Sequence, residues 1–144
     1  MFRKEIMFKK YSIKTVTNYD ISRIVRIYNS NKMFLENHLA VSEISNDFIH
    51  NEIEEMKKIG FRSILIIDNE IHKAVGLCDY KIGECTYLSL LMVDGKMKRK
   101  GLGTQIYTYL EREFINQKAH SVRIDVVDDY EGNAAGFWIK QGFR

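Results

Sequence analysis

A short basic segment that contains two glycines is the part of this sequence best suited to chemistry. Residues 98–103 read Lys-Arg-Lys-Gly-Leu-Gly, and Lys96 lies two positions before them. The chain has 22 basic and 19 acidic residues, so the four basic residues within 96–100 carry the whole excess of positive charge. A nucleic-acid-binding protein usually spreads Lys and Arg along a face, whereas one basic loop suits a compact polyanion such as a phosphate group. A solvated charged turn is the alternative interpretation.

The position of this segment favours phosphate binding. It lies between an expected strand that ends at Val93 and an expected helix that starts near Leu102. A helix N-terminus offers free N–H groups and the positive end of the helix dipole, and glycine at 101 and 103 lets the backbone approach a ligand closely. The dinucleotide fingerprint would require glycine where Ile106 stands, and no P-loop motif is present. Neither of those two phosphate loops is therefore expected.

Other chemistry is poorly supported by the composition. The four histidines are scattered without metal-ligand spacing, so no metal site is expected. The spacing of Cys78 and Cys85 fits neither a redox pair nor a zinc knuckle, which predicts two buried free thiols. No stretch approaches the ~18–20 apolar residues of a membrane span, and the N-terminus has no apolar signal region. These features predict a cytoplasmic protein that does not associate with membranes.

The chain that must position the basic loop reads as a single domain over residues 1–144, without repeats or linkers. Apolar residues at helical spacing alternate along the chain with β-branched runs. They predict strands at 11–16, 63–67, 71–80, 85–93 and 121–126, and helices at 21–28, 45–59, 102–115 and 133–141. Asp20 is the expected cap of the first helix, and Ser45 begins the second helix, which Gly60 ends. Gly76 marks a bulge, and 31–41 is irregular. The order β-α-α-β-β-β-α-β-α predicts an α+β fold with a mixed, mostly antiparallel sheet flanked by helices.

A second motif lies in the last expected helix, where residues 134–143 read Ala-Ala-Gly-Phe-Trp-Ile-Lys-Gln-Gly-Phe. With the loop at 98–103, it resembles the GCN5-related N-acetyltransferases (GNAT superfamily), which transfer an acetyl group from acetyl-CoA to an amine. The family hallmarks are Gln/Arg-x-x-Gly-x-Gly/Ala, here with Lys98 in first place, and Ala-x-x-Phe-Tyr-x-Lys-x-Gly-Phe, here with Trp138 at the tyrosine. The element order from Tyr11 to Phe143 also resembles that of the family.

The resemblance implies a binding site for acetyl-CoA. In the family the fourth strand splays from the fifth, and the pantetheine arm enters the gap like an extra strand. The matching backbone is Leu91 to Val93, with the Leu91 N–H polarising the acetyl carbonyl, and the pyrophosphate would lie on the amides from Arg99 to Thr104. The residues expected to bind the co-substrate are Leu91, Met92, Val93, Lys98, Arg99, Lys100, Gly101, Leu102, Gly103, Thr104, Asn133 and Phe137.

The acid and the base of the reaction are less clearly marked. Some relatives carry a glutamate base on the fourth strand where this chain has Tyr87. Three carboxylates are candidates for the base by neighbourhood alone, namely Glu36, Asp79 and Glu84. Each is expected to be a solvated surface group rather than the base. The usual tyrosine acid is replaced by Trp138, whose indole cannot act as an acid near neutral pH and is expected to pack. Tyr87, Tyr130 or solvent would then protonate the leaving thiolate.

The function predicted on this basis is acetyl-CoA-dependent N-acetylation of a primary amine of a small molecule or peptide by direct transfer. A non-catalytic acyl-CoA-binding or regulatory module is the alternative, and nucleic-acid binding through the basic loop is the third. Relatives shape the acceptor site with the segment that corresponds to 29–45. They also continue past Gly-Phe with one or two strands, so we expect either a truncated sequence or a partner, such as a second copy in a homodimer, on the edge of the 122–127 strand.

Overall fold

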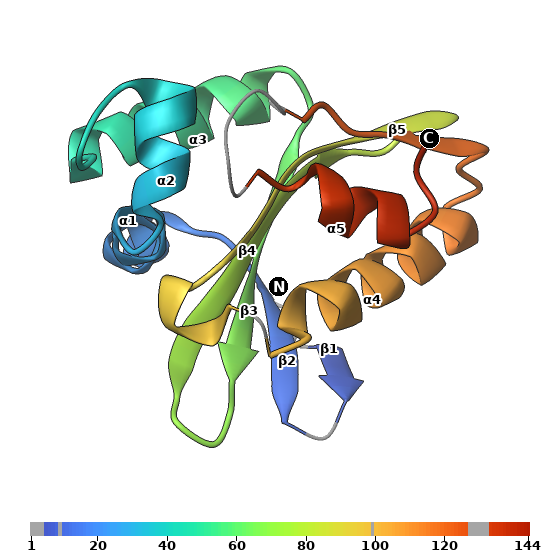
Figure 1. Cartoon of the computed structure of the whole chain (residues 1–144), viewed down its shortest axis with the longest axis horizontal. Coiled ribbons are helices and arrows are strands. Elements are labelled where there is room, and N and C mark those ends of the chain that lie inside the picture. Colours follow the sequence, from blue (N-terminus) through green and yellow to red (C-terminus); the bar gives the residue numbers. More distant parts are fainter. Residues whose placement is uncertain (1–4, 9, 99, 127–132) are drawn as a thin grey trace.

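A computed structural model describes residues 5–8, 10–98, 100–126 and 133–144 of the chain (Figure 1). Its strands form one sheet in which spatial order follows chain order. The strands are β1 (Glu5–Phe8), β2 (Tyr11–Thr15), β3 (Arg62–Asp68), β4 (Lys73–Lys81), β5 (Cys85–Val93) and β6 (Ser121–Arg123). Neighbours from β1 to β5 are antiparallel, and β6 runs parallel to β5. The mixed, mostly antiparallel sheet confirms the predicted fold class.

Helices cover both faces of this sheet (Figure 1). They are α1 (Ile21–Asn29), α2 (Lys32–Phe34), α3 (Asn46–Lys58), α4 (Leu102–Asn116) and α5 (Ala135–Lys140). α1 and α3 pack over one core cluster, in which Ile27 and Leu65 are fully buried. α4 and α5 pack over the other, in which Ile106 and Ile66 are fully buried. The apolar stripe of each helix thus faces the sheet, as its helical spacing predicts.

Local signals placed most helix and strand boundaries correctly. The Ser45 hydroxyl accepts a hydrogen bond from the Phe48 N–H at 3.2 Å, and Gly60 follows α3 with a φ of +88°. Gly76 lies beside a register shift between β3 and β4. A Cβ on Gly76 would lie 3.1 Å from the Ile106 Cδ1 atom, so this glycine lets α4 pack closely on the sheet. The predicted caps and the predicted bulge are confirmed, except at Asp20.

Some local predictions were wrong. The Asp20 carboxylate does not cap α1 but accepts a hydrogen bond from the Thr17 N–H in the preceding 3-10 turn. Residues 31–39 are not irregular: α2 and a π-helical turn (Leu35–Leu39) follow α1, because Leu35 is fully buried and anchors them. β1 was missed, since four residues are too few to show a pattern. β6 ends at Arg123, shorter than predicted.

The two cysteines differ from each other. Cys78 is buried, as predicted, and burial raises the pKa of its thiol. Cys85 is exposed, against the prediction, because it begins β5 opposite Ser121, at an end of the sheet where both strands are open to solvent. In the described part of the chain, no helix is long and apolar enough to cross a bilayer.

Candidate functional site

β5 and β6 separate shortly after they begin. Their pairing comprises Cys85 with Ser121, Thr86 with Val122 and Tyr87 with Arg123. β5 continues to Val93, but within the described residues no strand pairs with this further part on the β6 side. Backbone N–H and C=O groups on such an edge are available to an extended ligand, which can add to the sheet like a strand.

A cleft of about 590 Å³ opens along this edge. β5 supplies Leu90 to Val93, and the start of α4 supplies Gly101 to Thr104. α5 supplies Phe137, Trp138 and Lys140. The cleft therefore joins an unpaired strand edge to the N-terminus of a 15-residue helix, which is where anions bind.

Most of the residues predicted to bind the co-substrate line this cleft. They are Leu91, Met92, Val93, Lys98, Gly101, Leu102, Gly103, Thr104 and Phe137. Lys100 is exposed beside it, and Arg99 lies outside the described residues. The Asn133 side chain accepts a hydrogen bond from the Ala135 N–H at 2.9 Å, at the start of α5, and does not line the cleft.

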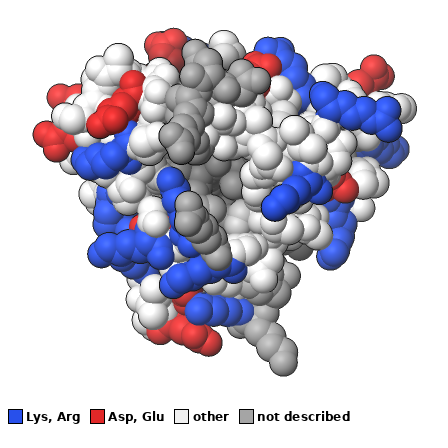
Figure 2. Space-filling view, in the orientation of Figure 1, with Lys and Arg blue, Asp and Glu red and all other residues white. Residues whose placement is uncertain are grey.

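Two glycines shape the phosphate end of the cleft. Gly101 precedes α4 with a left-handed φ of +78°, a conformation that favours glycine. A Cβ on Gly103 would lie 3.2 Å from the Phe137 ring, so glycine lets α4 and α5 approach closely here. Lys and Arg side chains gather around the loop that joins β5 to α4 (Figure 2). The residues present thus fit a ligand that carries a phosphate group.

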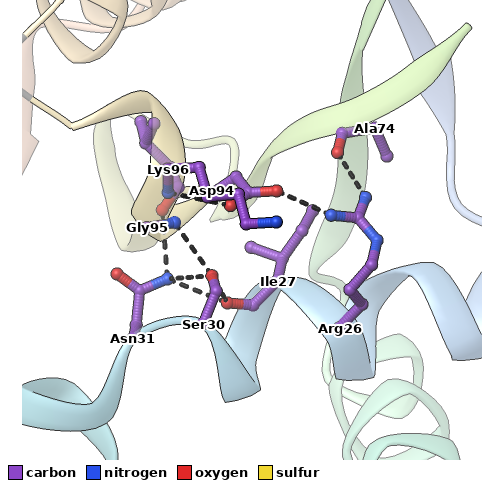
Figure 3. Close-up of polar contacts among 9 residues, drawn as sticks. Arg26, Ile27, Ser30, Asn31, Ala74, Asp94, Gly95 and Lys96 are labelled. Atoms are coloured by element: carbon purple, nitrogen blue, oxygen red, sulfur yellow. Dashed lines mark hydrogen bonds and ion pairs between the residues drawn. The ribbon is translucent and has the colours of Figure 1, made fainter.

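A polar network ties the chain after β5 to the end of α1 (Figure 3). The Arg26 guanidinium donates to the Asp94 carboxylate at 2.6 Å and to the Ala74 carbonyl at 2.6 Å. Burial alone would raise the pKa of Asp94, but the Lys96 N–H and Arg26 hold that pKa below its usual value. The Ser30 hydroxyl accepts from the Gly95 N–H at 2.8 Å. This network fixes where the basic loop begins.

Sequence reasoning did not single out Asn31, which belongs to the same network. Its side chain is 3% exposed and donates to the carbonyls of Val93 (3.0 Å) and Ile27 (2.8 Å). Asn31, Met33 and Phe34 line the cleft opposite β5. The segment 29–45, which contains Asn31, was expected to shape the acceptor site. No neighbouring residue marks Asn31 as a cleft residue, because its hydrogen-bond partner Val93 is 62 positions away.

The close approach at Gly95 gives a direct test of this network. A Cβ at this position would lie 2.2 Å from the Ser30 carbonyl oxygen, so Gly95→Ala must displace α1 or the loop. We expect the free energy of unfolding to fall by about 1–3 kcal/mol, as for other overpacked sites, and the affinity of the cleft for a ligand that carries a phosphate group to fall with it. Urea unfolding and calorimetry measure the two effects. Gly83→Ala is the matched control, since its Cβ would make only ordinary contact; an equal effect of both variants would contradict the proposed role of the network.

The expected acid and base candidates occupy different environments. Tyr87 lies where β5 and β6 stop pairing and is not among the described residues that line the cleft. Its hydroxyl donates to Asp125 at 2.9 Å, and burial together with this hydrogen bond raises its pKa. Tyr130 lies outside the described residues. Trp138 is 9% exposed and makes edge contacts with Tyr107 and Phe143, which confirms a packing role.

The three carboxylates expected at the surface do not behave alike. Glu36 and Glu84 are exposed, as predicted. Asp79 is only 7% exposed, so the prediction that it is solvated was wrong. Its burial was not expected because the residues that cover it come from α1 and α3, which lie far from it in the sequence. No group of three or more His, Cys, Asp or Glu within the described residues is placed to hold a metal ion.

Comparison with known proteins agrees with this geometry. A family model described as "Acetyltransferase (GNAT) domain" matches residues 35–144. An acetyltransferase from Thermus thermophilus has 24% identity and a TM-score of 0.73, over 94% of this chain and 88% of that one. A GNAT family acetyltransferase from Staphylococcus aureus has 11% identity and a TM-score of 0.65, over 90% and 97%. Glucosamine-6-phosphate N-acetyltransferase from Arabidopsis thaliana has 15% identity and a TM-score of 0.59, over 94% and 92%. No curated protein sequence matches this chain.

The family model places the molecule in the class of acyl-transferring domains, and the solved structures share its α+β fold. The chain belongs to the GNAT acetyltransferase domain family. Membership of this family implies an acyl-CoA and an acceptor as the two ligands.

Proposed function

We propose that this protein is an acetyl-CoA-dependent N-acetyltransferase that moves an acetyl group to a primary amine of a small molecule or peptide by direct transfer. The observation that carries the proposal is the cleft in which the unpaired edge of β5 meets the N-terminus of α4. An extended arm with amide groups can pair with that edge, while a pyrophosphate lies on the helix N-terminus. Family membership supports acyl transfer as the reaction.

The roles of the cleft residues follow from their chemistry. The backbone of Leu91 to Val93 would hold the pantetheine arm, with the Leu91 N–H donating to the acetyl carbonyl. Such a donor stabilises the negative charge that develops in the transition state and is typically worth about 2.7–4 kcal/mol. Lys98, Lys100 and the amides from Arg99 to Thr104 would hold the pyrophosphate, and Phe137 would pack against the arm. Asn133, which accepts a hydrogen bond at the start of α5, would contact the pantetheine or the adenosine side of the co-substrate.

The CoA thiolate is a good leaving group and needs little acid catalysis from the protein. A thiol has a pKa of about 8.5, so a CoA thiolate leaves readily even without a strong acid. Tyr87 and Tyr130 stay our candidates for the proton donor, with solvent as the third source. Loss of either hydroxyl should therefore lower the rate of transfer without abolishing it.

Two measurements test the proposed function. Calorimetric titration with acetyl-CoA should give saturable binding, and the absence of any heat at high micromolar ligand would refute it. A thiol-release screen over polyamines, amino acids, aminoglycosides and peptide N-termini should then find at least one acceptor. Binding without thiol release for every amine would instead indicate a non-catalytic acyl-CoA-binding module.

A further inference from the structure

A buried carboxylate lies beside the cleft and has no role in the function proposed so far. Asp79 on β4 is in register with Ser63 on β3 and with Leu90 on β5. Residues opposite each other on antiparallel strands present their side chains on the same face of the sheet. Asp79 is therefore the neighbour of Leu90, which lines the cleft.

Three of the elements packed against Asp79, namely β3, α1 and α3, each present a polar group to it. The Ser63 hydroxyl of β3 hydrogen bonds with its carboxylate, while Tyr28 of α1 and Glu52 of α3 face it from above the sheet. These four residues line a cavity of about 20 Å³, whose remaining walls are apolar and include no Lys or Arg among the described residues. A cavity of at least ~10–15 Å³ with several polar partners can hold a water molecule. The cavity therefore has room and polar partners for one water molecule, and no described basic side chain lines it beside Asp79.

This cavity adjoins the cleft through one ring contact, and it includes a residue of the outer surface of α3. The ring of Tyr28 meets the ring of Phe34 edge-on, with 5.9 Å between centroids, and Phe34 lines the cleft. On the other side Glu52 is exposed on the outer surface of α3. A proton that reaches Asp79 from the cleft therefore has a carboxylate exit to bulk water.

We propose that Asp79 takes up, through the cavity it shares with Tyr28, Ser63 and Glu52, the proton that the acceptor ammonium must lose before it attacks. This inference rests on the proposed function. The ammonium N–H bond breaks, its proton passes to the Asp79 carboxylate, and the freed electron pair of nitrogen forms the bond to the acetyl carbon. When the C–S bond breaks, the electron pair leaves on the CoA sulfur, which takes a proton from the donor named above (Tyr87, Tyr130 or solvent). The nitrogen gives its second proton to solvent, and Asp79 releases its proton to solvent as well. The acceptor class is therefore an aliphatic amine that is protonated at neutral pH.

The electrostatics of the site agree with this role. Burial raises the pKa of Asp79 to about 6, while the Ser63 hydrogen bond lowers it and the charge of Glu52 raises it further. A carboxylate with such a pKa is ionised at pH 7 to 8, yet it is a much better base than a solvated aspartate. General bases work best when their pKa lies near the working pH.

The pH dependence of kcat/KM tests the inference, with thiol release followed for the fastest amine of the panel above. The wild-type rate should fall as the pH drops through about 6. Asp79→Asn should lower kcat/KM by a factor of about 10²–10⁴, the usual contribution of a general base, and should remove this acid limb. The dissociation constant of acetyl-CoA should stay unchanged. Glu52→Gln, on an exposed residue, should move the acid limb to lower pH because it removes the charge that raises the pKa of Asp79.

Asp68→Asn is the matched control, since Asp68 is 1% exposed on β3 but pairs with Lys10 and the following turn. It should keep both the rate and the acid limb. An Asp79→Asn enzyme within threefold of wild type, a loss of acetyl-CoA binding in that variant, or an acid limb unmoved by Glu52→Gln would each overturn the inference. Wild-type protein that acetylates no amine would overturn the proposed function as well, so the two failures are distinguishable.

Discussion

Replacing Gly103 by aspartate should abolish the binding of acetyl-CoA while leaving the fold intact. Gly103 is the second residue of α4 and lines the cleft. A Cβ there would lie 3.2 Å from the Phe137 ring, so this ring must shift by a few tenths of an ångström to admit the new side chain. A carboxylate in the first turn stabilises a helix by about 0.3–1 kcal/mol, but it occupies the place where the pyrophosphate would lie. We expect the dissociation constant to rise at least about 100-fold, which corresponds to about 2.7 kcal/mol.

Gly103→Asn separates charge from bulk in this experiment. Asparagine has nearly the same size as aspartate and carries no charge, so it should weaken binding less. The difference between the two variants should shrink as salt is added, because salt screens the repulsion between carboxylate and phosphate. Calorimetry measures both constants, and circular dichroism confirms that the helices persist. Unchanged affinity in Gly103→Asp would show that the loop at 98–103 does not bind the phosphates.

The parts of the fold that the sequence predicts well are those set by neighbouring residues. β5 spans Cys85–Val93 as predicted, and α4 starts at Leu102, because an alternating run, a turn and a helix stripe are all local patterns. The cleft could be anticipated for the same reason, since its phosphate end is one contiguous strand–loop–helix unit. Motif resemblance then supplied the ligand that this unit suits.

The parts that were missed depend on contacts between distant segments. Residues 31–39 have no helical period, yet they form helical turns around the buried Leu35. Asn31 is recognisable as a cleft residue only once Val93 lies beside it. Asp79 lies in a strand whose interior is buried on both faces. The helices that cover Asp79 itself, α1 and α3, come from an earlier part of the chain. The composition and the residue spacing give no information about burial by distant segments.

Replacing Asp79 by asparagine should make the protein more stable than the wild type at pH 8. This gain in stability should become smaller as the pH falls. The pKa of Asp79 is raised from 3.8 to about 6. A raised pKa means that the folded state binds the proton more tightly than the unfolded state does. Below the unfolded pKa, Asp79 is protonated in both states and does not destabilise the folded protein. The free energy of unfolding then falls as the pH rises through about 6. At pH 8 the ionised carboxylate costs about 3 kcal/mol, at 1.36 kcal/mol for each unit of pKa shift.

Asparagine has the shape of aspartate and stays neutral, so it should recover most of this free energy at pH 8 and about half as much at pH 5. Urea unfolding at the two pH values measures the difference. Asp94→Asn provides a control of opposite sign, because Lys96 and Arg26 hold the pKa of Asp94 below its usual value and its neutral variant should lose stability at pH 8. A less stable Asp79→Asn protein at pH 8 would contradict the assigned pKa shift. Functional sites commonly sacrifice stability for activity, so a variant that is stabilised and also loses its acid limb would mark Asp79 as a residue kept for chemistry rather than for packing.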